Sequence, residues 1–79
     1  MTLDDAIRQI QLTIKATSSG TEIKVVKISD EEARISVYAA AENMQSIKDA
    51  TFQPVLDFLM EGLDIQVFVY DKNNPIATT

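Results

Sequence analysis

The side chains that most often carry enzymatic chemistry are missing from this sequence. Its 79 residues contain no histidine and no cysteine. Without histidine, the chain lacks the side chain best suited to proton transfer near neutral pH and the usual activator of a serine nucleophile. Without cysteine, it has no nucleophilic thiol, no thiolate metal ligand and no disulfide. We therefore expect a protein that is not an enzyme.

The densest cluster of chemically active residues is the acidic run Asp30, Glu31 and Glu32. Calcium and magnesium prefer oxygen ligands, but such a site needs about six oxygens that converge on the ion. A solvated turn explains the same residues more simply, so we assign no metal ligand, and the sequence alone leaves metal binding here open. The only glycines are Gly20 and Gly62, so there is no glycine-rich phosphate-binding loop. We expect no cofactor.

The charge balance indicates which partners to exclude. Twelve acidic and seven basic residues give a net charge of -5, which repels nucleic-acid phosphates and anionic lipid headgroups. The hairpin predicted below carries basic and aromatic residues, but the signature of sheet-based RNA readers is missing. We expect no nucleic-acid and no membrane partner. The first residues lack the apolar core of a signal peptide, which predicts a cytoplasmic protein.

The length predicts one α+β domain over residues 1–72, followed by a loose tail at 73–79. A chain of this size buries only about 60 to 65% of the surface that its unfolded form exposes, so the monomer has a small margin of stability. Since no disulfide is available, association is the remaining way to stabilise the fold. The hydrophobic content of 46% is typical of a soluble globular domain.

The first predicted element is an amphipathic helix. One apolar stripe at helical spacing contains Leu3, Ile7, Ile10 and Ile14. Thr2 and Asp5 have the spacing of a helix N-cap, and Gly20 favours a left-handed residue at the helix end.

Two strands follow this helix. Residues 21–28 alternate with a period of two, but the apolar positions change sides between Val25 and Val26, which predicts a bulge or twist. Residues 34–39 alternate again after a polar turn at 29–32. Two strands joined by so short a loop are expected to form an antiparallel hairpin.

Residues 42–62 allow two arrangements because Pro54 lacks an amide hydrogen. Either one helix is kinked at Pro54, or a short helical turn precedes a second helix that begins near Gln53. We favour the second arrangement, since proline is tolerated in a first helical turn. Met44 and Met60 are expected to fill gaps in the core. The stripe predicted to face the core contains Phe52, Val55, Leu56, Leu59 and Leu63.

The third strand is predicted at residues 65–70, which are almost entirely β-branched or aromatic. The resulting fold is a two-layer α+β sandwich of α-β-β-α-β order, with both helices on one face of a three-stranded sheet. The hairpin is too tight for another strand to insert, so the third strand is an edge. We favour strand order 2-1-3, which makes all neighbours antiparallel.

An edge strand usually contains a lysine, a proline or an inward-pointing charge that prevents pairing, because its unpaired main-chain groups can otherwise bind other chains. The third strand has none of these. Alternation also predicts that Phe68 and Tyr70 project from the sheet face opposite the helices, together with Tyr38 of the second strand. Three explanations stay open for this aromatic face: the chain's own tail, or a loop with Met44 and Ile47, covers it; a second copy binds there; or a peptide or small apolar ligand does. We expect a small interaction or regulatory protein that acts as a homodimer, and the alternative is a binding module for a peptide or small apolar ligand. The predicted interface residues are Tyr38, Val67, Phe68 and Tyr70.

Overall fold

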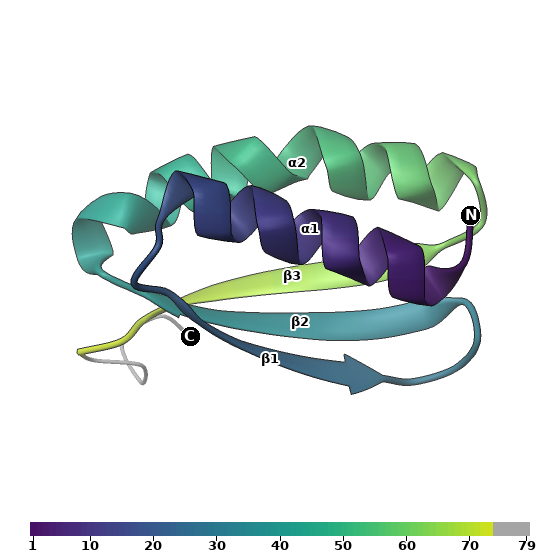
Figure 1. The fold of residues 1–79 in the computed structure, drawn as a ribbon, viewed down its shortest axis with the longest axis horizontal. Coiled ribbons are helices and arrows are strands. Elements are labelled where there is room, and N and C mark those ends of the chain that lie inside the picture. Colours follow the sequence, from purple (N-terminus) through teal and green to yellow (C-terminus); the bar gives the residue numbers. More distant parts are fainter. Residues whose placement is uncertain (74–79) are drawn as a thin grey trace.

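The computed structural model describes residues 1–73 and confirms an α+β fold in two layers (Figure 1). Two helices lie side by side on one face of a three-stranded sheet. The predicted tail at 73–79 lies outside the described residues, except for Asn73 in the turn after the last strand. The elements in chain order are α1 (Leu3–Thr17), β1 (Glu22–Lys27), β2 (Glu32–Ala39), a 3-10 turn (Ala41–Asn43), α2 (Met44–Met60) and β3 (Asp64–Asp71).

The strand order is β1-β2-β3, so the predicted order 2-1-3 is wrong. β1 and β2 form the expected antiparallel hairpin, but β3 pairs in parallel with β2. α2 carries the chain back to the start of β2, so β3 runs in the same direction as β2. The central position of β2 has a physical reason in its side chains. All four of its helix-facing residues are fully buried, namely Ala33, Ile35, Val37 and Ala39, whereas three of the six residues of β1 are charged.

The hairpin is regular, and the predicted change of face within the first strand does not occur. β1 pairs residue by residue with β2 from Glu22 opposite Tyr38 to Lys27 opposite Ala33. Because the alternation continues without a bulge, Val26 and Ile28 are exposed. Their apolar character therefore reflects strand propensity rather than burial.

α1 follows the sequence pattern at its start and along its length. The hydroxyl of Thr2 accepts a hydrogen bond from the N–H of Asp5 (3.2 Å), as expected of an N-cap. The four residues of the predicted apolar stripe are all buried. The helix ends at Thr17 with Ser18 as its cap, so Gly20 does not have the left-handed role expected of it; Gly62, after α2, has the positive φ of 90°.

α2 is one helix that runs through Pro54, so the predicted second helix starting near Gln53 is wrong. Pro54 removes one main-chain donor from the helix. Ile47 lies before it and Phe58 after it, and both are buried in the core. Packing on both sides of the proline thus keeps the two halves in one helix.

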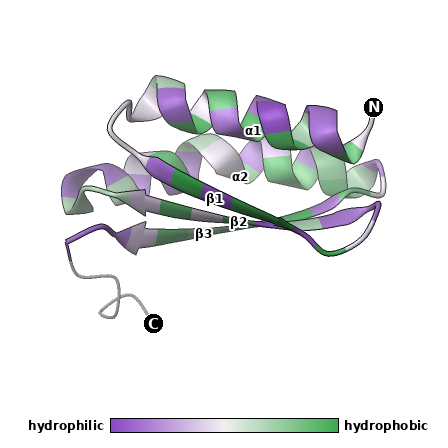
Figure 2. Cartoon of the chain, turned by 60° about the horizontal axis from the view of Figure 1, so that its bottom comes forward, coloured by the Kyte–Doolittle hydropathy of each residue, from purple (hydrophilic) through white to green (hydrophobic). Residues whose placement is uncertain are grey.

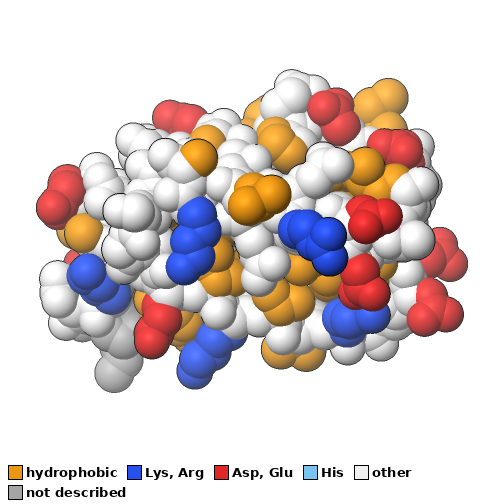
Figure 3. Space-filling view, in the orientation of Figure 1, with side chains coloured by type: hydrophobic (Ala, Val, Ile, Leu, Met, Phe, Trp, Pro, Cys, Tyr) orange, Lys and Arg blue, Asp and Glu red, His pale blue; other side chains and the backbone are white. Residues whose placement is uncertain are grey.

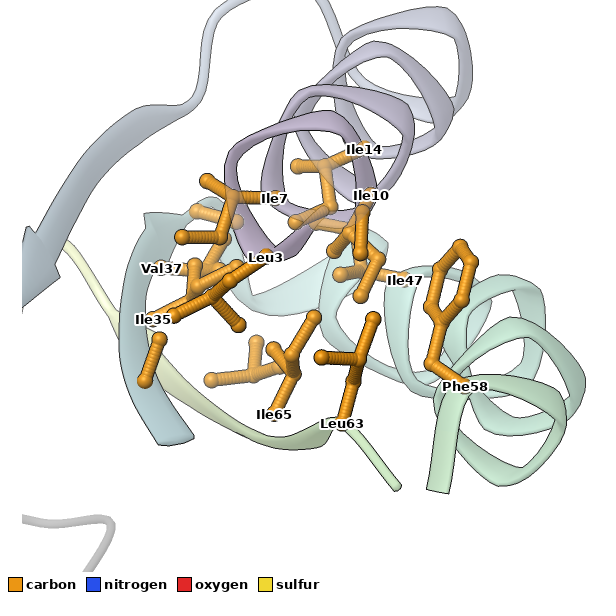
Figure 4. Packing of buried hydrophobic residues seen from close by; sticks show 14 residues of the cluster. Leu3, Ile7, Ile10, Ile14, Ile35, Val37, Ile47, Phe58, Leu63 and Ile65 are labelled. Atoms are coloured by element: carbon orange, nitrogen blue, oxygen red, sulfur yellow. The ribbon is translucent and has the colours of Figure 1, made fainter. Parts of the chain in front are cut away.

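The face of α2 that packs on the core also differs from the prediction. Figure 4 shows Ile47 and Phe58 pointing toward Ile10 and Ile14 of α1. Met44 does pack against the core as expected, but Met60 is exposed. Of the predicted core stripe, three residues are exposed instead: Phe52, Leu56 and Leu59.

Candidate functional site

The free edge of the sheet at β3 presents main-chain hydrogen-bonding groups. β3 is bonded to β2 on one side, and no other strand of residues 1–73 lies on its other side. The N–H of Asp64 donates to the carbonyl oxygen of Glu31 (2.8 Å), next to the start of β2. Successive residues of a strand direct their main-chain groups to opposite sides, so the even-numbered residues of β3 bond to β2. The residues whose N–H and C=O groups point to the free side are Ile65, Val67 and Val69.

The side chains of these same three residues face the helices. Ile65 and Val69 are buried, while Val67 between them is only half-buried. Val67 is therefore incompletely covered by the helix layer. The predicted interface residue Val67 lies at the middle of the edge, where both its main chain and part of its side chain are accessible.

A groove of about 460 Å³ runs between α2 and the free edge of β3. We call it the β3-edge groove. On the helix side it is lined by the outward row Phe52, Leu56 and Leu59, and Phe52 is 68% exposed. Lys48 is the basic residue in its lining. An exposed apolar row of this kind beside an unpaired edge is typical of an interaction site.

The position of the helix layer explains this groove. α2 packs mainly on β3, and α1 lies closer to β2 than to β1, although Asp4 of α1 reaches Lys27 of β1. The layer is thus displaced toward β3, and Figure 4 shows α2 on the side of the core away from β2. As a consequence, α2 extends past the last strand, and its outward row has no strand beneath it.

Figure 2 turns the sheet face opposite the helices toward the viewer. The even-numbered residues of β2 and β3, which include Tyr38, Phe68 and Tyr70, project from this face. The rings of Tyr38 and Tyr70 stack with centroids 5.3 Å apart. The Arg34 guanidinium lies 5.7 Å from the ring centroid of Phe68, and Phe68 is 41% exposed. We call Tyr38, Phe68 and Tyr70 the aromatic sheet face. The structure places these three residues together on the face where the sequence put them; their role as an interface stays a prediction.

One of the two segments that could cover this face, the loop with Met44 and Ile47, does not lie over it. Ile47 is fully buried in the core between the helices and the sheet, and Met44 packs against that core. Both residues therefore lie in the helix layer and not over the aromatic sheet face. The other covering segment considered, the tail, lies outside the described residues.

The opposite edge of the sheet, at β1, has a different lining. A hollow of about 520 Å³ between α1 and the start of β1 is lined by the polar residues Arg8, Gln11, Lys15, Thr21 and Glu22 and by the apolar residues Leu12 and Ile23. At the other end of β1, the Nζ of Lys27 lies 3.0 Å from a carboxylate oxygen of Asp4. This edge is flanked by charges of both signs, which is how sheets normally discourage pairing with other chains.

The acidic turn forms no cation site among residues 1–73. No group of three or more carboxylates within this part of the chain is close enough to hold a metal ion. Figure 3 shows acidic side chains spread over the end of the molecule that contains the N-terminus and the β1–β2 turn. In the same described part, neither helix combines the length and the apolar character needed to cross a membrane.

Comparison of the chain with protein-family models, with curated proteins and with solved structures gives no match. The residues that sequence reasoning missed are Phe52, Leu56 and Leu59, which were assigned to the core. The available signal was that α2 is apolar on more than one side, while a helix over a sheet needs only one apolar stripe.

Proposed function

We propose that the protein is a small non-enzymatic interaction protein that pairs the free edge of β3 with a strand from another chain. The observation that carries the proposal is the run of six uncharged residues, 65–70, along an edge that adjoins the β3-edge groove. Charges occur in β3 only at its two ends, Asp64 and Asp71. Nothing in this strand opposes the addition of a further strand.

Strand addition uses both kinds of group that the edge exposes. The main-chain groups of Ile65, Val67 and Val69 provide hydrogen bonds, and these give affinity without regard to sequence. The apolar residues beside them provide pockets for alternate side chains of the added strand, which give specificity. The main-chain groups and the apolar residues both occur along residues 65–69.

Amide hydrogen exchange tests this proposal directly. In the free monomer, the amides of Ile65, Val67 and Val69 are expected to exchange fast, while those of Gln66 and Phe68, which bond to β2, exchange slowly. When another chain pairs with the edge, the three fast amides become protected. Protection is measured at rising protein concentration and with added extended peptides. If neither condition protects these amides, the proposal is overturned.

A homodimer through the aromatic sheet face is the second candidate, and the exposed stack on that face favours it. Two copies can pack sheet on sheet through Tyr38, Phe68 and Tyr70, with the sheets about 10 Å apart. Analytical ultracentrifugation at micromolar concentration is expected to show twice the 8.8 kDa of one chain. Phe68→Lys is expected to restore the monomer with unchanged circular dichroism. A wild-type protein that sediments only as one chain contradicts the dimer.

A further inference from the structure

We infer that the occupant of the β3-edge groove is an extended segment of a partner protein, with apolar residues at alternate positions and a basic residue at the end that lies beside Asp64. This inference rests on the proposed function, in which the edge of β3 accepts a strand. A second copy of the chain is the other occupant to consider, and the geometry of the helix layer opposes it.

The widths of the two layers show that the sheet is one strand too narrow. Two packed helices with axes about 10 Å apart occupy about 20 Å. Three strands spaced about 4.8 Å apart occupy about 14 Å, and a fourth strand raises this to about 19 Å. Because the helix layer is displaced toward β3, the part of this layer without a strand beneath it is α2. The β3-edge groove therefore lies where a fourth strand would lie.

A second copy that paired through its own β3 would bring its own α2 to the same place. Such a dimer has six strands that span about 29 Å, but its four helices require about 40 Å. The two α2 helices would compete for the space above the junction. Each chain also has a net charge of -5, so two copies repel each other. A segment without a helix of its own meets neither obstacle.

The groove lining indicates which side chains the segment needs. Residues that point toward α2 meet the outward row of Phe52, Leu56 and Leu59 and the half-buried Val67. These positions require apolar side chains. The alternate residues lie on the other face of the sheet, beside Gln66 and Phe68, where polar side chains remain in water. The segment therefore alternates apolar and polar residues with the period of a β-strand.

The charges at one end of the groove indicate the polarity of the segment. Asp64 lies directly opposite Glu32 on the neighbouring strand, in register. Within residues 1–73 the one ion pair is that of Lys27 with Asp4, so neither carboxylate of the Asp64–Glu32 pair is matched by a cation. Like charges in opposing positions of a sheet destabilise it. A lysine or arginine at the adjacent position of the added strand relieves this repulsion.

Antiparallel pairing is slightly more stable per residue than parallel pairing, so the residue beside Asp64 belongs to the carboxyl end of the segment. Two end-blocked heptapeptides of equal composition test the assignment. The first, Thr-Val-Thr-Val-Thr-Ile-Lys, places its lysine beside Asp64, and the second, Lys-Val-Thr-Val-Thr-Ile-Thr, places it at the far end. Affinity is measured by calorimetry at low ionic strength.

The first peptide is expected to bind about threefold more tightly than the second, as befits a partly exposed ion pair. Asp64→Asn is expected to remove this difference. Phe52→Lys is expected to weaken both peptides at least about tenfold, because it places a charge in the apolar lining. Leu12→Lys on α1 is the matched control, since Leu12 is 63% exposed, nearly as much as Phe52. It is expected to leave both affinities unchanged.

Other outcomes separate this inference from the proposed function. If neither peptide binds, and the wild-type protein is a dimer that Phe52→Lys dissociates and Leu12→Lys does not, a second copy occupies the groove. The inference is then overturned and the proposed function stands. Equal binding of the two peptides to the wild-type protein overturns the assigned polarity. If neither peptides nor rising concentration protect the edge amides, both the inference and the proposed function are overturned.

Discussion

The two edges of the sheet have the same main-chain geometry but differ in how many charged residues lie in and beside them. At β1, as at β3, alternate residues point their main-chain groups away from β2, because the N–H of Ile28 donates to the carbonyl of Glu32 (2.9 Å) and fixes the register. β1 is nevertheless charged in half of its residues and is flanked by Arg8 and Lys15 of α1. β3 is uncharged between its ends and is flanked by apolar residues of α2.

The two edges thus differ in whether charged residues protect their unpaired main-chain groups. Unpaired main-chain groups are a property of every open sheet, and charges usually prevent them from recruiting other chains. In this protein one edge has that protection and the other does not. The unprotected edge is also the one that the helix layer overhangs, so the two features that favour strand addition occur together.

The largest expected effect concerns the two faces of α2. Phe58→Ala is expected to lower the free energy of unfolding by about 3–5 kcal/mol, because it leaves a cavity in the core. Phe52→Ala is expected to change it by less than about 0.5 kcal/mol, because the side chain is exposed. Urea unfolding measures both. If Phe52→Ala were as destabilising as Phe58→Ala, the outward row would belong to the core and the β3-edge groove would not exist.

The sequence could not predict this arrangement of α2, and the reason is physical. Phe52, Leu56 and Phe58 are all large apolar residues within two helical turns. Only the position of the sheet beneath the helix decides which of them is covered. A local pattern records that residues are apolar, but it does not record how wide the opposing layer is.

The parts of the fold that were predicted correctly depend on local patterns. The stripe of α1, the hairpin and the strand at 65–70 each follow from the spacing of neighbouring residues, and so does the placement of Phe68 and Tyr70 on one face. The neighbour of β3 depends instead on a contact between distant parts of the chain. A usable signal was that the inward positions of β2, such as Ile35 and Val37, are free of charge.

A smaller effect is expected from matched substitutions in the middle of each edge strand. Val25 and Val67 both pack partly against the core. A lysine at either position is expected to lower the free energy of unfolding by about 1–2 kcal/mol, because a charged group is unfavourable at a half-buried site. Only Val67→Lys is expected to prevent protection of the β3 edge amides by the heptapeptides. If Val25→Lys abolished this protection to the same extent, peptide binding would depend on overall stability and not on the β3 edge.

On the helix-free face the expected changes in stability are smaller still. Phe68→Lys removes the contact with the Arg34 guanidinium and is expected to lower the free energy of unfolding by about 0.5–1 kcal/mol. Val26→Lys, at an exposed position of β1 on the same face, is the matched control and is expected to stay within about 0.5 kcal/mol. Thermal unfolding of both variants checks this. Global unfolding of Phe68→Lys would mean that Phe68 is a core residue.

The smallest effect is expected at the ion pair beside β1. Asp4→Asn removes the carboxylate that contacts Lys27, and both side chains are at least half exposed. Such pairs contribute about 0.2–1 kcal/mol, and less at high salt. Urea unfolding at two ionic strengths measures the difference. A loss above about 1 kcal/mol that persists in high salt would show that this edge is held by more than surface charge.

The alternation along β3 has an evolutionary consequence. Ile65, Val67 and Val69 point their main-chain groups to the free side, and their side chains face the interior, although Val67 is only half-buried. Gln66, Phe68 and Tyr70 hold the strand to β2 with their amides while their side chains face the surroundings. Substitutions of the second set during evolution can thus change the chemistry of the exposed sheet face, while the main-chain groups of the first set keep their positions along the free edge.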